Sequence, residues 1–381
     1  MLHEAALAPA ATAVFTAVLT EGPLSRVALA RRLDLSSAAV TKGARPLIEL
    51  GYLEELAATE RTGPGAGRPA SPLAVRADRE FFVGVKITGD ELIGVVCDLR
   101  AEIRASAHRP LPTPDVDQVL ASLASLVDEL LDGDFRARTR RLGLAVSGDV
   151  DYSTGLVRYS PFLGWRDVPL RSRAEQVIGL TVTVENDVKA LTTAEHWFGE
   201  GVGAESFALV TVGAGIGCGL VVGGRLVSGS HGVAGEIGHI AVDANGPDCH
   251  CGGRGCVEAL AGASAIVRQA RAVAGRPELT LPDAVALARA GDAAVGAVFD
   301  RAGDAIGAGI AAVANLVGPA RIVVSGEGLS AYDLFEPRIR ESFQRQAFGA
   351  AADCPLSIRP LPFEQWARGA ATVSIKALVA S

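Results

Sequence analysis

The hydrophobic and polar positions near the N-terminus predict three consecutive helices. Apolar residues recur at helical spacing over residues 8–20, and a second short helix is expected over residues 24–33. Ser36 is a suitable N-cap for a third helix, which is expected to run to Leu50. Gly51 then stands where a helix commonly ends in a left-handed glycine. The spacing therefore predicts a helical group at the start of the chain.

After these helices the pattern predicts a β-hairpin. Residues 52–56 and 71–75 have the character of strands, and the Gly/Pro-rich segment 61–69 between them is typical of a turn. Three helices followed by a hairpin are the order of a winged helix-turn-helix, so we expect a DNA-binding domain over residues 1–76. The alternative is a small helical adaptor without DNA contact, because a helix-turn-helix pattern alone is a weak signal.

The third expected helix has one apolar and one polar face. Its apolar face, expected in the core, comprises Val40, Ala44 and Leu47. Its polar face, expected to contact DNA, comprises Ser37, Thr41, Lys42 and Arg45. Short polar and cationic side chains suit base edges and phosphates in a major groove. Arg68, in a Gly-Arg-Pro turn at the tip of the expected wing, is predicted to reach a minor groove.

From about residue 81 onward, strand-like and helix-like segments alternate. Short runs rich in Val and Ile predict strands at 81–86, 92–98, 142–146, 180–184, 208–211, 218–222 and 321–324. Helical periodicity is found in the longer segments 116–131, 188–197, 263–274, 281–290 and 293–317. This alternation predicts an α/β protein with mixed sheets.

Composition and charge narrow the class of protein. The 381 residues are 49% hydrophobic, which allows a large core and excludes disorder throughout. Residues 1–76 carry eight Lys/Arg against seven Asp/Glu, whereas the remainder carries 28 against 36. A near-neutral head on an acidic body fits a DNA-reading module joined to a part that does not touch DNA. We expect a cytoplasmic protein without membrane contact, because no apolar run reaches about 20 residues and the N-terminus lacks a basic signal region.

A cysteine cluster predicts a structural zinc site. Cys249, Cys251 and Cys256 lie in a glycine-rich segment, and His239 precedes them by ten residues. Three thiolates and one imidazole are a common set for closed, tetrahedral zinc, which leaves no position for an activating water. His250 is the competing nitrogen ligand. We prefer His239, because His250 stands between two ligand cysteines and its side chain is expected to point away.

Carboxylates and amides gather in the sequence around the same segment. Asn186 and Asp187 follow an expected strand, Glu236 precedes His239, and Glu258 follows the last cysteine of the cluster. Carboxylates accept and amides donate the hydrogen bonds by which sugar hydroxyls are recognised. Each residue alone is more typical of a helix cap or a surface position, but together they predict a carbohydrate pocket.

The segment from Gly232 to Glu258 resembles the ROK family of repressors and sugar kinases. It reads Gly-Val-Ala-Gly-Glu-Ile-Gly-His followed by Cys-x-Cys-Gly-Gly-x-Gly-Cys-x-Glu, and the resemblance extends over nearly the whole chain. It implies an actin-like, hexokinase-like two-lobed ATPase fold behind the winged helix. We expect the lobes at residues 80–185 and 186–365, with a C-terminal helix over 366–381 returning to the first.

The resemblance also implies residue roles. The residues expected to contact a sugar are Asn186, Asp187, Glu236, His239 and Glu258. His239 would use one ring nitrogen for the sugar and the other for zinc. In kinases of the family, the aspartate that matches Asp187 is the general base that deprotonates the sugar hydroxyl.

Departures from the family pattern favour a regulator over a kinase. The first phosphate loop of the kinases reads Asp-x-Gly-Gly-Thr, whereas residues 86–90 read Lys-Ile-Thr-Gly-Asp. The Mg²⁺-binding acid has become Lys86, and Asp90 replaces the phosphate-binding threonine, so the loop would repel ATP. Ala214 stands where kinases usually have a threonine in a second loop. We expect no kinase activity, with Asp187 kept as a sugar ligand.

One further departure concerns the ligand. Phe162 replaces an asparagine that kinases and many regulators carry, so the sugar is either modified or no longer bound. We expect a sugar-responsive repressor that binds a two-fold operator as a homodimer or homotetramer. The alternatives are an ATP-dependent sugar kinase with a DNA-binding head and a constitutive DNA-binding protein without an inducer.

Overall fold

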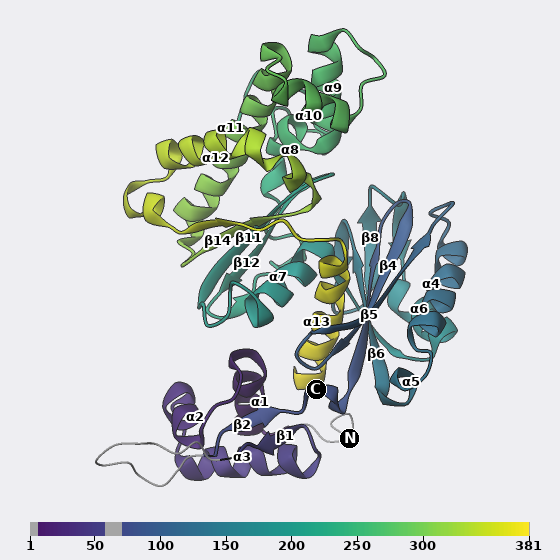
Figure 1. The fold of residues 1–381 in the computed structure, drawn as a ribbon, viewed down its shortest axis with the longest axis vertical. Helices are drawn as coiled ribbons and strands as arrows, with labels where there is room; N and C mark the ends of the chain where they lie inside the picture. Colours follow the sequence, from purple (N-terminus) through teal and green to yellow (C-terminus); the bar gives the residue numbers. More distant parts are fainter. Residues whose placement is uncertain (1–6, 58–70, 381) are drawn as a thin grey trace. The chain divides into compact units, whose positions relative to one another are not determined.

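The computed structural model describes residues 7–57 and 71–380 and divides into two compact units (Figure 1). Unit 1 comprises the chain up to Gly203 and the segment from Glu364 onward, and unit 2 comprises Ala204–Phe363. Helix α7 (Asp187–Phe198) packs against α13 (Glu364–Ala380). Unit 1 therefore runs past residue 185, where the sequence places the end of the first lobe.

The N-terminal elements follow the predicted order. They are α1 (Pro9–Glu21), α2 (Arg26–Leu33), α3 (Ser37–Glu49) and the antiparallel pair β1 (Leu53–Glu55) and β2 (Leu73–Val75). Helix α3 begins as predicted, because the Ser36 hydroxyl accepts the Ala39 N–H at 3.1 Å. It is followed by Gly51 at φ +77°. The predicted turn between β1 and β2, with Arg68, lies outside the described residues.

The two faces of α3 are confirmed. Val40, Ala44 and Leu47 are fully buried, whereas all four predicted DNA-facing residues of this helix are exposed. The buried face shares a hydrophobic cluster with Phe15 of α1 and with Ile375 of α13. Burial of the apolar stripe thus turns the polar stripe of α3 to solvent.

A five-stranded mixed sheet forms the centre of unit 1. Its strands are β3 (Phe81–Ile87), β4 (Glu91–Asp98), β5 (Ile103–Pro110), β6 (Thr139–Val146) and β10 (Thr181–Asn186). Their order is β10-β6-β3-β4-β5, in which β10, β6 and β3 are parallel and β4 and β5 are antiparallel to their neighbours. One face packs against α4 (Val116–Leu130) and α6 (Leu170–Ile178) in one hydrophobic cluster.

Helix α13 packs on the other face of this sheet at very short range. Gly84 of β3 and Gly143 of β6 are register partners. A Cβ on Gly84 would lie 2.0 Å from the Ala367 carbonyl oxygen, and one on Gly143 would lie 1.9 Å from that of Ala370. The glycine pair is therefore required for the helix backbone to approach the sheet.

A separate three-stranded antiparallel sheet follows β6. It consists of β7 (Asp149–Asp151), β8 (Leu156–Ser160) and β9 (Trp165–Val168). Trp165 is buried, and its indole N–H donates to the Pro114 carbonyl at 2.7 Å. Phe162, in the turn before β9, is 53% exposed.

Unit 2 repeats the strand topology of unit 1. Its strands are β11 (Ser206–Val212), β12 (Ile216–Val222), β13 (Arg225–Leu226), β14 (Ile322–Ser325) and β15 (Leu356–Ile358). Their order is β13-β12-β11-β14-β15, again with an antiparallel meander on one side and parallel strands on the other. This repetition of one topology in two units is the arrangement expected for an actin-like fold.

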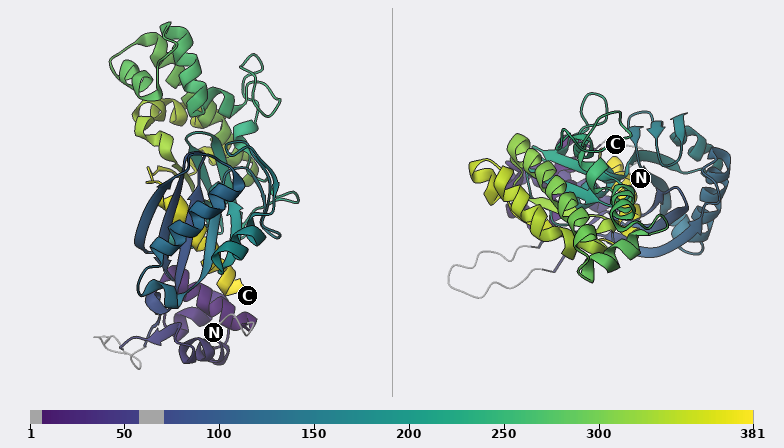
Figure 2. Two further views of the ribbon diagram at one scale, coloured as in Figure 1. Left: turned by 90° about the vertical axis from the view of Figure 1, so that its right-hand side faces the viewer. Right: turned by 90° about the horizontal axis from the view of Figure 1, so that it is seen from above.

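Helices α8 to α12 surround the core of unit 2. They are α8 (Val257–Ala261), α9 (Ala263–Ala274), α10 (Leu281–Arg289), α11 (Ala293–Val317) and α12 (Tyr332–Gln346). The long helices α11 and α12 lie side by side (Figures 1 and 2). Among the described residues, every helix is too short or too polar to cross a membrane.

Candidate functional site

Asp187 lies at the N-terminus of α7 in a buried ion pair with Lys86. Its Oδ2 atom also accepts the Ser147 hydroxyl at 2.6 Å, and its Oδ1 atom accepts the Val188 N–H at 2.9 Å. Lys86 donates to Ser147 Oγ at 2.9 Å, and its ammonium lies 5.5 Å from the centre of the Trp366 ring. The carboxylate and the ammonium thus satisfy one another in a nearly solvent-free environment.

The pKa of Asp187 follows from this environment. Burial alone would raise the pKa of this carboxyl. The positive charge of Lys86 and the hydrogen bonds from Lys86, Ser147 and the Val188 N–H act in the opposite direction. The net result is a pKa below the ordinary value for aspartate. Asp187 is therefore ionised at neutral pH, with its charge neutralised by Lys86.

The sheet topology explains how these residues meet. Lys86 is near the end of β3, Ser147 follows β6, and Asp187 follows β10. Because these strands are parallel neighbours, their carboxyl ends lie at the same edge of the sheet, where α/β proteins commonly bind ligands. Sequence reasoning missed Ser147 and the contact between Lys86 and Asp187, since neither has a local signal.

Asn186 caps α7. Its side-chain oxygen accepts the Lys189 N–H at 3.2 Å, and its side-chain nitrogen donates to the Gly148 carbonyl at 2.9 Å. Both ends of this amide are therefore engaged within the chain, as is typical of an N-cap.

In the turn after β3, backbone N–H groups donate to a side chain of the same turn. Thr88 Oγ1 accepts the backbone N–H of Glu91 at 2.9 Å and that of Asp90 at 3.4 Å. The same hydroxyl lies 2.8 Å from Asp90 Oδ1 and 2.9 Å from the Glu91 carbonyl oxygen. These backbone donors, which a phosphate loop would offer to its ligand, are thus used by the loop's own threonine.

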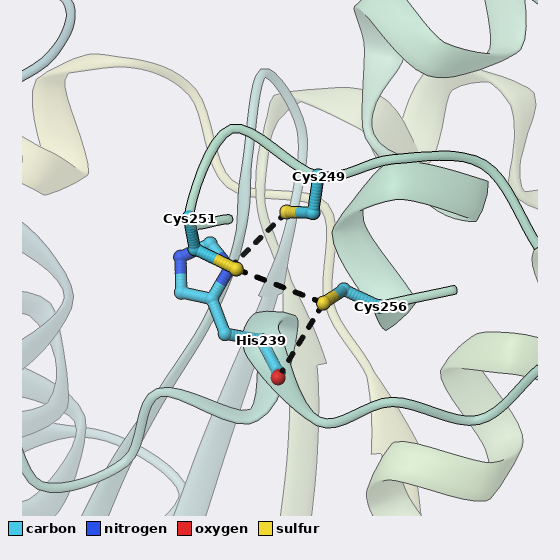
Figure 3. A group of neighbouring side chains, drawn as sticks. All are labelled: His239, Cys249, Cys251 and Cys256. Carbon is cyan, nitrogen blue, oxygen red and sulfur yellow. Dashed lines mark hydrogen bonds between the residues drawn. The ribbon is translucent and has the colours of Figure 1, made fainter. Parts of the chain in front are cut away.

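The four predicted metal ligands come together in unit 2 (Figure 3). His239 Nδ1 lies 3.6 Å from Cys249 Sγ, and the sulfur atoms of Cys251 and Cys256 are 3.8 Å apart. A tetrahedron with Zn–S bonds of about 2.3 Å has S···S edges of about 3.8 Å. The spacing of these donors therefore fits a tetrahedral metal ion.

Local backbone features shape the cysteine loop. Gly255 has φ +64°, and a Cβ there would lie 1.6 Å from the Asp243 carbonyl oxygen. The Cys249 N–H donates to the Gly253 carbonyl at 2.8 Å, and the Gly253 N–H points to Cys251 Sγ at 3.4 Å. Gly255 thus takes a conformation that a larger residue would strain.

Glu258 and the two histidines form a second group beside the cysteines. Glu258 Oε2 accepts the Ile216 N–H at 2.9 Å, and Glu258 Oε1 lies 2.7 Å from His250 Nε2. His239 belongs to both groups. His250 does not join the cysteine cluster but turns to Glu258, a contact the sequence did not indicate. Glu236 is exposed, directly before the short helix that carries His239.

The predicted sugar-contact residues are divided between the units. Asn186 and Asp187 lie in unit 1, and Glu236, His239 and Glu258 lie in unit 2. The unit 1 residues stand where β10 ends and α7 begins, and the unit 2 residues precede or follow the cysteine loop.

The exposed face of α3 carries the predicted DNA contacts. Thr41 Oγ1 donates back to the Ser37 carbonyl at 2.9 Å. Arg45 pairs with Glu49 on the next turn at 2.7 Å, with 79% of its side chain exposed. Such an exposed pair contributes little to stability, so the arginine can exchange Glu49 for another anion at low cost.

Fold, duplicated sheet topology and cysteine loop together define a two-lobed α/β protein with a winged helix-turn-helix head. The chain belongs to the ROK family, whose profile matches residues 82–376. This confirms both the predicted family and its actin-like fold. The matched residues begin after the N-terminal head.

Similar proteins include transcriptional regulators whose matches extend beyond the ROK domain. The transcriptional dual regulator NagC of Escherichia coli K12 is 30% identical over 348 residues, covering 89% of this chain and 85% of NagC. A solved ROK transcriptional regulator, a homologue of the E. coli Mlc protein, has a TM-score of 0.81 and 28% identity over 97% of this chain and 96% of its own. A Streptomyces griseus glucokinase solved with glucose and AMPPNP has a TM-score of 0.68 and 29% identity, and covers 78% of this chain and 99% of the kinase.

Proposed function

We propose that this protein is a sugar-responsive transcriptional regulator that acts as a repressor. The observation that carries the proposal is the presence of the N-terminal head together with the ROK domain. The matches to the two regulators cover 89% and 97% of the chain, whereas the glucokinase match covers 78% of the chain. A kinase has no use for a winged helix with an exposed cationic face.

The environment of Asp187 supports the absence of kinase activity. A general base must accept a proton from the substrate hydroxyl, which requires a free lone pair and a suitable pKa. Here Lys86 and Ser147 both donate to Oδ2, the Val188 N–H donates to Oδ1, and Lys86 helps to hold the pKa of Asp187 below its ordinary value. The hydroxyl of Thr88 also occupies backbone donors of the first phosphate loop. Phosphoryl transfer would therefore lack both its base and its phosphate cradle.

We propose zinc as the resident metal, held by His239, Cys249, Cys251 and Cys256. Zinc with four protein ligands has no open position, so its role is structural. It would fix the loop that precedes Glu258. The ring nitrogen of His239 that does not face Cys249 remains available to a ligand.

We also propose which residues contact the operator DNA and which contact the sugar. Ser37, Thr41, Lys42 and Arg45 would read the major groove, and Arg68, beyond the described residues, would reach the minor groove. A sugar or sugar derivative would bind through the five predicted contact residues. It would act on DNA affinity only if it bound one conformation of the repressor better than the other. We further propose a cytoplasmic homodimer or homotetramer.

The test of this function has two measurements on the full-length protein. Operator sequences are selected from a genomic DNA library, and affinity is then measured with and without glucose, N-acetylglucosamine and N-acetylmannosamine. We expect a sugar to change the affinity for DNA. A coupled ADP-release assay with the same sugars is expected to stay at background. Sugar-dependent turnover of about 1–100 per second that is lost in Asp187→Asn would instead identify an enzyme.

A further inference from the structure

Two glycine-rich turns meet at one edge of the sheet of unit 2. Strands β11 and β14 are parallel neighbours, with Thr211 opposite Ser325. The first turn, residues 213–217, follows β11 and includes the first two residues of β12, and the second, residues 326–328, follows β14. Carboxyl ends of parallel strands are the usual place for ligands in α/β sheets. Glycine-rich turns with free backbone N–H groups bind anions, phosphates above all.

In this chain two N–H groups of the first turn already have anionic partners. The Ala214 N–H donates to Glu327 Oε1 at 2.8 Å. The Ile216 N–H donates to Glu258 Oε2 at 2.9 Å. Two carboxylates of the protein itself therefore lie on backbone donors that an anionic ligand would need.

Two glycines leave room for the Glu327 carboxylate to lie directly on the first turn. A Cβ on Gly213 would lie 2.0 Å from Glu327 Oε1, so the carboxylate rests directly against this glycine. Gly326 has φ +115°, and a Cβ there would lie 2.4 Å from the Val212 carbonyl oxygen. Glycines at both positions thus let the second turn approach the first closely enough for Glu327 to reach it.

We propose that Glu327 is a built-in occupant of the anion position of the 213–217 turn and excludes phosphate-bearing ligands from it. The carboxylate takes the hydrogen bond that a phosphate oxygen would take, fills the space above Gly213 and repels a second anion. This inference is independent of the sugar and of DNA binding. It concerns unit 2 and adds a barrier to nucleotide binding beyond the altered loop at residues 86–90.

The test compares wild type with Glu327→Gly, which removes the carboxylate and opens the space above Gly213. Glu327→Gln, which keeps the volume but removes the charge, is the second variant. Glu278→Gln is the matched control, because Glu278 is an exposed acid of the same unit in the loop before α10. The probe is inorganic pyrophosphate, titrated calorimetrically into the full-length protein in a buffer free of phosphate and sulfate.

We expect pyrophosphate to bind Glu327→Gly roughly tenfold or more tightly than wild type, since a charge-assisted hydrogen bond to a backbone N–H is released for the ligand. Glu327→Gln should gain less, and Glu278→Gln should match wild type. Hydrogen exchange gives a readout that does not need a ligand: the Ala214 amide should exchange faster in Glu327→Gly than in the control. Equal pyrophosphate affinity in wild type and both Glu327 variants would overturn the proposal. So would an unchanged exchange rate at Ala214.

Discussion

Replacing Lys86 by methionine tests the assignment of the buried ion pair. Methionine keeps most of the length of the side chain and removes its charge. Asp187 would then remain buried without its cation but would keep the Ser147 hydroxyl and the Val188 N–H. Removing one partner of a buried pair costs about 3–5 kcal/mol. Because two hydrogen bonds to the carboxylate persist, we expect the lower end of that range.

A loss of about 3 kcal/mol lowers the melting temperature by about 6–12 °C for a unit of this size. The double variant Lys86→Met, Asp187→Leu removes both charges together, so it should recover most of the loss. Lys42→Met is the control, because Lys42 is exposed on α3 and its replacement should cost less than about 0.5 kcal/mol. The assay is thermal unfolding followed by circular dichroism.

The direction in which stability changes with pH distinguishes loss of the ion pair from simple loss of packing. In wild type the pKa of Asp187 is lowered on folding. Its contribution to stability is therefore present above the unfolded pKa of about 3.9 and is lost as the pH falls through the folded pKa. In Lys86→Met, burial is expected to raise the pKa of Asp187, so stability is lost as the pH rises through about 4 toward neutrality. The deficit of the variant should be larger at pH 7.5 than at pH 4.5. A deficit that is equal at both pH values, or absent, would refute the ion-pair assignment.

Three other predictions follow from separate parts of the structure. Elemental analysis should find one zinc per chain, and Cys251→Ser should lose the metal and stability while Cys354→Ser retains both; freshly purified, chelator-free wild type without zinc would contradict the metal site. Arg45→Ala should weaken binding to the selected operator by about 1–3 kcal/mol, measured by fluorescence anisotropy, and Arg340→Ala, an exposed arginine of α12, should leave it unchanged. Gly143→Ala should destabilise the protein by about 1–3 kcal/mol, because its Cβ would overlap the backbone of α13; a melting temperature equal to that of wild type would show that this contact is not tight.

Local patterns in the sequence were sufficient to predict many of the helices and strands. Helices α9 and α11 begin and end at the predicted residues, because their apolar periodicity is uninterrupted and each is followed by a left-handed glycine. The cap at Ser36 and the spacing of the cysteines are likewise short-range features. Strand β5 was missed, because it is an edge strand that alternates half-buried small residues with exposed polar ones. Helix α12 was missed because its sequence is strongly polar and contains Pro337.

The sequence alone also determined the chemistry that is available: which residues are acids, cations and thiols, and that a lysine stands in the degenerate phosphate loop. Only the tertiary structure decided which of them meet. Lys86 and Asp187 are 101 positions apart, and Ala214 and Glu327 are 113 apart. In each case the partners are brought together by parallel strands whose carboxyl ends share one edge of a sheet. Pairing between distant strands is set by the burial of whole faces rather than by local propensity, so no window of sequence contains the information that places a carboxylate on a particular backbone N–H.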